Sequence, residues 1–148
     1  MEKTQTLNMD YLERIRHFGS NANPFFCLMG IEVDSADNGE AALRMPLRPD
    51  MLNGEGWLQG GIYTALSDEA MVLAIYTMLS PEERIATITE TTTFLAGSRD
   101  GMLFASGKVV KKGRRVVFAE GEIREGEAGG TLLSRSTAAF AVVRDRHT

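Results

Sequence analysis

The chain has 148 residues, of which 43% are hydrophobic and 24% charged, and its formal net charge is −4. This length suits one domain with one hydrophobic core, and the acidic balance argues against nucleic acid as the main partner. No apolar run approaches the roughly 20 residues of a membrane-spanning helix, and the first residues do not resemble a secretory signal, so we expect a cytoplasmic protein without membrane association. The single cysteine, Cys27, excludes an intrachain disulfide and a cysteine-based metal cluster.

The first part of the chain is predicted to form two short helices and a hairpin. Residues 8–18 carry apolar side chains at helical spacing, and Pro24 can begin a second short helix that Gly30 ends. Two strand-like segments, 31–36 and 41–47, flank Asn38-Gly39, and this pair is a strong signal for a tight hairpin turn.

A long helix and four strands are predicted for the rest. Residues 60–79 are apolar nearly all round, which is typical of a buried helix. Glycine-containing turns separate the strand-like segments 85–95, 102–111, 115–124 and 132–143. We therefore expect a single α+β domain over residues 1–148, with residues 1–22 as a helical extension and one antiparallel sheet of about five to six strands enclosing the helix.

The beginning of the long helix has the features of a catalytic site. Gly60-Gly61 open the helix, so backbone N–H groups can point at an anion or a polarised carbonyl, and glycine lets a substrate come close. Asp68 lies in the middle of the same apolar helix, where burying a carboxylate is costly. The alternatives are structural, namely an Asp68 hydrogen-bonded to a neighbouring hydroxyl and a glycine pair that allows close packing.

These motifs resemble the PaaI-type acyl-CoA thioesterases, which have the hotdog fold. The resemblance covers residues 22–143 and rests on Met51-Leu52-Asn53-Gly54, Gln59-Gly60-Gly61 and Asp68, with weaker matches at Asn23-Pro24-Phe25, Gly30-Ile31, Thr89 and Lys112-Gly113-Arg114. It implies hydrolysis of an acyl-CoA or aryl-CoA thioester to the free acid and CoA. The family usually has histidine where Gln59 stands, and glutamine can only donate or accept hydrogen bonds as a neutral group.

The resemblance also implies roles for single residues. The Gly60 amide would stabilise charge on the thioester carbonyl oxygen, Asp68 would act as base or nucleophile, and Asn53 would orient the water or the carboxylate. Gln59 completes the expected catalytic set. Substrate contacts are expected from Gly61, Trp57, Thr89 and, for the phosphates of CoA, Lys112, Gly113 and Arg114, with Arg99 as a further candidate. The plain alternatives are a simple turn at Asn53, a solvated charged hairpin at 111–115, and a Trp57 that packs against the helix start.

The spacing of Gly60 and Asp68 predicts an oligomer. Eight residues span about 12 Å along a helix axis, so one thioester carbon cannot be served by both groups of one chain. We therefore expect Asp68 to come from a second subunit of a homodimer, and the resemblance implies that dimers pair further into tetramers. We expect neither metal nor cofactor, since CoA is part of the substrate. The rival functions are a non-catalytic acyl-CoA-binding protein and an acyl-CoA hydratase.

Overall fold

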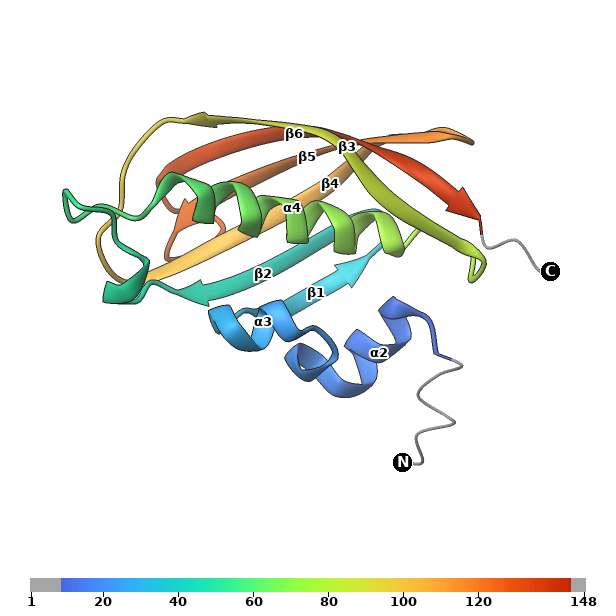
Figure 1. The fold of residues 1–148 in the computed structure, drawn as a ribbon, viewed down its shortest axis with the longest axis horizontal. Coiled ribbons are helices and arrows are strands. Elements are labelled where there is room, and N and C mark those ends of the chain that lie inside the picture. Colours follow the sequence, from blue (N-terminus) through green and yellow to red (C-terminus); the bar gives the residue numbers. More distant parts are fainter. Residues whose placement is uncertain (1–8, 145–148) are drawn as a thin grey trace.

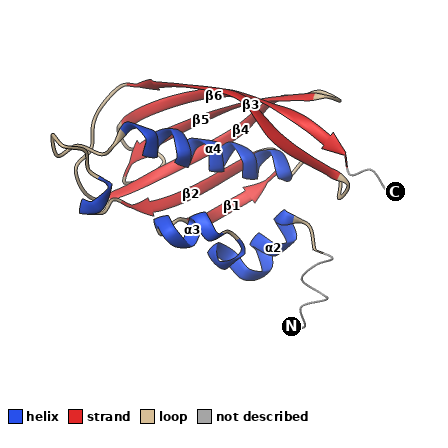
Figure 2. Cartoon of the chain, in the orientation of Figure 1, coloured by secondary structure: helices blue, strands red, loops and turns tan. Residues whose placement is uncertain are grey.

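Six antiparallel strands curve around one long helix in the computed structural model, which describes residues 9–144 (Figure 1). The helical elements are α2 (Tyr11–Phe18), η1 (Gly19–Ala22), α3 (Pro24–Met29), η2 (Pro49–Met51) and α4 (Gly60–Tyr76). The strands are β1 (Glu32–Asp37), β2 (Glu40–Pro46), β3 (Glu83–Phe94), β4 (Met102–Lys112), β5 (Val116–Glu125) and β6 (Leu132–Arg144). Their order in the sheet is β1-β2-β4-β5-β6-β3, and α4 lies across one face (Figure 2). The predicted α+β hotdog fold is confirmed.

Local signals set the first elements. The side chain of Asp10 accepts from the Glu13 N–H and Glu13 reaches back to the Asp10 N–H, so a reciprocal capping box begins α2. Asn23 caps α3, and Gly30 ends it with a φ of 74°. Residue 8, where the sequence predicts α2 to begin, lies outside the described residues.

The β1–β2 hairpin turns at Asn38-Gly39 as predicted. Both residues have positive φ, 50° and 77°, and the flanking Asp37 and Glu40 are paired, which is the backbone of a two-residue primed turn. The Gly39 N–H donates to the hydroxyl of Thr77 at 2.7 Å, and this hydroxyl donates to the carbonyl of Ala74 at 2.6 Å. Thr77 thus ties the hairpin to the end of α4, which ends at Tyr76 rather than at the predicted residue 79.

Helix α4 is held very close to the sheet. A Cβ built on Gly107 of β4 would lie 2.3 Å from the Ala70 carbonyl oxygen, so the backbones of helix and strand almost touch there. Ser67, Ala70, Met71 and Leu73 are fully buried on this side of the helix. Most of the helix is therefore covered by the sheet, as its apolar sequence predicts.

Strand β3 contains a bulge that decides which of its side chains face α4. The register shifts between Thr87 and Thr89, so that Glu90 pairs with the buried Ala138, whereas Thr89 pairs with Ala139. Paired residues share a face of the sheet, and Thr92 on the side of Glu90 bonds to Thr64 of α4 at 3.0 Å. Glu90 therefore faces the helix and Thr89 the outer face.

Candidate active site

The loop before α4 is organised by Asn53. Its side-chain oxygen accepts from the N–H groups of Glu55 at 2.9 Å and Trp57 at 3.1 Å, and its own N–H donates to the Trp57 carbonyl at 2.7 Å. Asn53 therefore builds the turn, as the structural alternative predicts. Because the oxygen is used twice inside the loop, the amide nitrogen of the side chain is the group left to donate to a substrate or water.

The first amides of α4 are open. Gln59 is the N-cap residue and makes no side-chain capping hydrogen bond, so it does not cover the N–H groups of Gly60 and Gly61. The Gln59 side chain instead folds over the helix start, since a Cβ at Gly61 would lie 2.8 Å from its Oε1. A side chain at position 61 would therefore displace the Gln59 side chain from the helix start.

A cavity of about 410 Å³ opens beside the Gly60 amide. It is lined by Asn53, Leu58, Gly60, Tyr63, Phe94, Leu95, Ala96 and Gly97. The rings of Tyr63 and Phe94 pack edge to face with centroids 5.8 Å apart, and burial raises the pKa of Tyr63. The cavity thus offers an apolar wall and backbone donors, a combination suited to an acyl group with a polar carbonyl.

Asp68 is partly buried on the side of α4 that faces β3. Its Oδ1 is buried and has no hydrogen-bond partner among the described residues, and the hydroxyl of Thr87 is the side-chain group bonded to the carboxylate. Burial raises the pKa of Asp68, and the bond from Thr87 partly opposes this. An unpaired carboxylate oxygen with a raised pKa is suited to accept a proton.

Two further carboxylates lie near Asp68. Burial and the charge of Asp68 raise the pKa of Glu69 and of Glu90 to about 7 each. Asn23 donates to Glu69 at 3.4 Å and to the Tyr11 hydroxyl at 2.9 Å, whereas Oε1 of Glu90 is buried without a partner among the described residues. No local sequence pattern marks Glu90, because its position beside Asp68 depends on the bulge in β3.

The predicted substrate contacts fall in different places. Trp57 is at the rim of the Gly60 cavity, where its ring contacts Gly97. Thr89 lies on the outer face of the sheet. The β4–β5 hairpin, which holds Lys112, Gly113 and Arg114, lies at the other end of α4 (Figure 1). Lys112 there is 3.5 Å from Glu83, whose Oε1 accepts from the N–H of Ser80 just beyond the helix.

Residues 55–131 match the model of the family described as Thioesterase superfamily. The chain belongs to the thioesterase superfamily. A protein of Halobacterium salinarum that carries an esterase name is 32% identical over 126 residues, which are 79% of this chain and 83% of that protein. A 1,4-dihydroxy-2-naphthoyl-CoA hydrolase of Listeria monocytogenes is 22% identical over 111 residues, 75% of this chain and 90% of the relative.

The fold of this thioesterase also matches solved structures. A thioesterase from Haemophilus influenzae superposes with a TM-score of 0.80 at 19% identity, over 90% of this chain and 94% of that chain. The predicted membership of the hotdog-fold thioesterases is confirmed, and the general activity of the chain is ester or thioester hydrolysis. No helix in residues 9–144 has the length and hydropathy to cross a membrane, and no three His, Cys, Asp or Glu side chains there form a metal-binding group.

Proposed function

We propose that this thioesterase hydrolyses an acyl-CoA or aryl-CoA thioester to the free acid and CoA. The observation that carries the proposal is the pair of open groups on α4, the uncapped amide of Gly60 at a cavity and the unpaired carboxylate oxygen of Asp68. Support for a CoA ester comes from the Listeria monocytogenes relative, which is named a CoA hydrolase.

The proposed reaction uses both groups. The Gly60 N–H donates to the thioester carbonyl oxygen and stabilises the negative charge that develops there. Asp68 takes a proton from water while the water oxygen bonds to the acyl carbon, the carbon–sulfur bond breaks, and the proton then passes to the CoA sulfur. In the nucleophilic alternative, Asp68 itself bonds to the acyl carbon, the carbon–sulfur bond breaks and CoA leaves as the thiolate. Water then hydrolyses the anhydride, which releases the acid and restores the Asp68 carboxylate, and the proton given up by water passes to the CoA sulfur. Either route needs only water, so we propose no metal or cofactor.

We further propose that Asp68 of the partner subunit serves each Gly60 cavity, since about 12 Å of helix separates the two positions in one chain. Strand β3 ends the sheet and has no further strand beside it in the described residues. Ile88, Phe94 and Leu95 in and after this strand are 55–58% exposed. A long edge with exposed apolar side chains favours pairing with a second copy. We propose that two such dimers pair further into a tetramer, as the family resemblance implies.

A thiol-release assay tests the proposal. The protein is incubated with a panel of acyl-CoA and aryl-CoA esters while a chromogenic reagent follows free thiol. We expect turnover by the unchanged protein, and a fall in kcat of about 10²–10⁴ in Asp68→Asn with the melting temperature retained. Tight binding of the esters without thiol release would instead establish the acyl-CoA-binding alternative.

Subunit mixing tests the shared site. Asp68→Asn and Gly60→Pro homodimers each lack one of the two groups at every site. A hybrid dimer would have one site with both groups intact, so mixing should restore part of the activity. No recovery after subunit exchange shown by mass spectrometry would contradict a site built from two chains.

A further inference from the structure

A stacked cation stands at the rim of the Gly60 cavity. The guanidinium carbon of Arg99 lies 3.8 Å from the centroid of the Trp57 ring. The same ring lies on the backbone of Gly97, where a Cβ would be 2.8 Å from Trp57 Cε3, so only glycine permits this contact. Gly97 is itself part of the cavity wall. Trp57 therefore connects the cavity lining to the Arg99 side chain.

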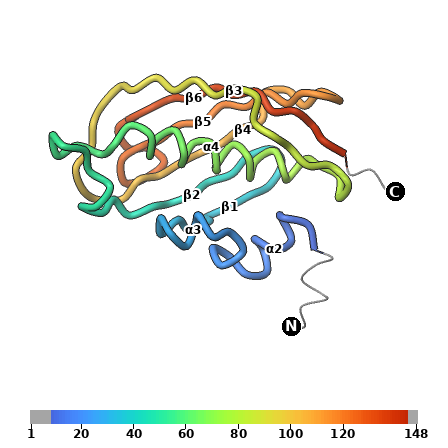
Figure 3. The backbone as a smooth tube through the Cα atoms, viewed as in Figure 1, coloured from blue at the N-terminus to red at the C-terminus, as the bar shows by residue number. Residues whose placement is uncertain are grey.

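The backbone on either side of this stack is fixed. The Leu58 N–H donates to the Ser98 carbonyl at 2.9 Å, and Ser98 is buried with its backbone beside the Tyr63 hydroxyl. Figure 3 shows the segment from the end of β3 to the start of β4 running past the start of α4. Leu58 and Gly60 both line the cavity, so Ser98 and the neighbouring Arg99 lie at the same end of α4 as the amide that we propose for catalysis.

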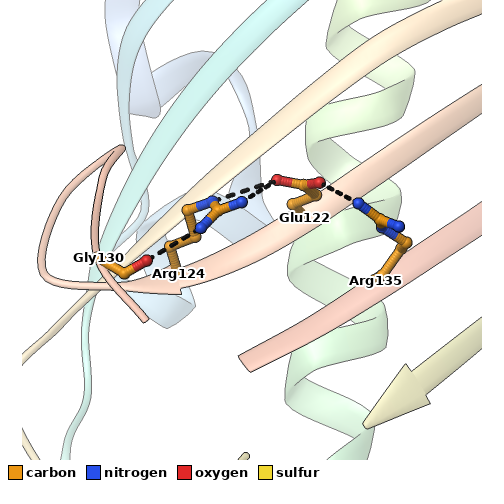
Figure 4. Close-up of polar contacts among 4 residues, drawn as sticks. All are labelled: Glu122, Arg124, Gly130 and Arg135. Atoms are coloured by element: carbon orange, nitrogen blue, oxygen red, sulfur yellow. Dashed lines mark hydrogen bonds and ion pairs between the residues drawn. The ribbon is translucent and has the colours of Figure 1, made fainter. Parts of the chain in front are cut away.

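Arg99 also differs from the paired cations of the sheet. Glu122 accepts from Arg124 at 3.0 Å and from Arg135 at 2.9 Å (Figure 4), whereas no carboxylate partner of Arg99 is found among residues 9–144. A guanidinium held over an indole ring can keep N–H donors free at its edge, and these donors match the geometry of a phosphate.

We propose that Arg99, positioned by Trp57, binds a phosphate of the CoA moiety. This rests on the proposed function, because the substrate must present its thioester at Gly60 and carry the phosphates outward from the sulfur. Within one chain Arg99 is a cation close to this cavity, whereas the Lys112–Arg114 hairpin lies at the far end of α4. The anion is thus bound in the same subunit that polarises the carbonyl.

Paired substrates test the assignment. The best acyl-CoA of the panel is compared with the same acyl group on N-acetylcysteamine, a thioester that has no phosphate. For Arg99→Gln we expect KM for the CoA ester to rise about tenfold or more with kcat unchanged, and no change for the phosphate-free ester. Arg16→Gln, which removes a charge from the distant α2, should leave both substrates unaffected.

Other outcomes separate the two proposals. An equal rise in KM for both esters, or no change for either, would refute phosphate binding by Arg99 while leaving the hydrolysis intact. If the unchanged protein hydrolyses neither ester, the proposed function fails, and calorimetry with CoA itself decides the inference through a tenfold weaker Kd in Arg99→Gln. Trp57→Leu should reproduce part of the rise in KM, or of the weaker Kd, that Arg99→Gln causes. Trp57→Phe, which keeps an aromatic ring under Arg99, should bind the CoA moiety as the unchanged protein does.

Discussion

The substitution Gly60→Pro isolates one backbone N–H. Residue 60 is the first residue of α4, where proline is well tolerated because that N–H has no helical partner. The preceding Gln59 has φ −63° and ψ 133°, the extended conformation that a residue before proline requires. Gly60→Ala is the matched control, since its Cβ would lie at an ordinary 3.5 Å from the ring of Phe94 and its N–H remains.

The expected loss follows from the single donor removed. Gly61 keeps its N–H, so Gly60→Pro should lose about 2.7–4 kcal/mol of transition-state stabilisation, or about 10²–10³ in kcat. Thiol release gives kcat, and calorimetry should show melting temperatures for both variants close to that of the unchanged protein. A fully active Gly60→Pro, or a Gly60→Ala as slow as the proline variant, would refute the role of this amide.

Three further substitutions test the fold and the charges around the site. Gly107→Ala must displace α4 by about 1 Å near Ala70 and should cost about 1–3 kcal/mol of stability with a loss of activity. The control Gly129→Ala, whose Cβ would enter open space, should keep the melting temperature of the unchanged protein. Equal melting curves for the two variants would contradict the close approach of helix and strand. The pKa of Glu90 is raised to about 7, so its stabilising contribution is complete below its unfolded pKa near 4.5 and is lost as pH rises through 7. Glu90→Gln should therefore reduce the fall in melting temperature between pH 5 and 8.5, and an unaltered fall would exclude Glu90 as its source. Asn53→Asp keeps the side-chain oxygen that holds the turn and should lower only kcat. Asn53→Ala removes this oxygen as well and should also lower stability by about 1 kcal/mol. Equal kcat in Asn53→Asp and the unchanged protein would show that the amide nitrogen has no role.

The order of elements was predictable because its signals are local. Asn38-Gly39 requires positive φ at both residues, Pro24 and Gly30 bound a short helix, and apolar side chains all round α4 need burial on several sides. All six strands lie within two residues of their predicted bounds. The helix end was wrong by three residues, since Thr77 is held by the distant Gly39, a contact that no helical pattern contains.

The candidate site divides in the same way. The sequence by itself determined that a glycine pair opens a buried helix and that Asp68 follows about 12 Å further along the helix axis, because helix geometry is a property of consecutive residues. Only the tertiary structure decided that the bulge in β3 turns Glu90 toward Asp68, that the 111–115 hairpin lies far from Gly60, and that Arg99 stacks on Trp57 beside it. These placements depend on strand register and on contacts between segments distant in the chain, which are fixed when the sheet closes around α4.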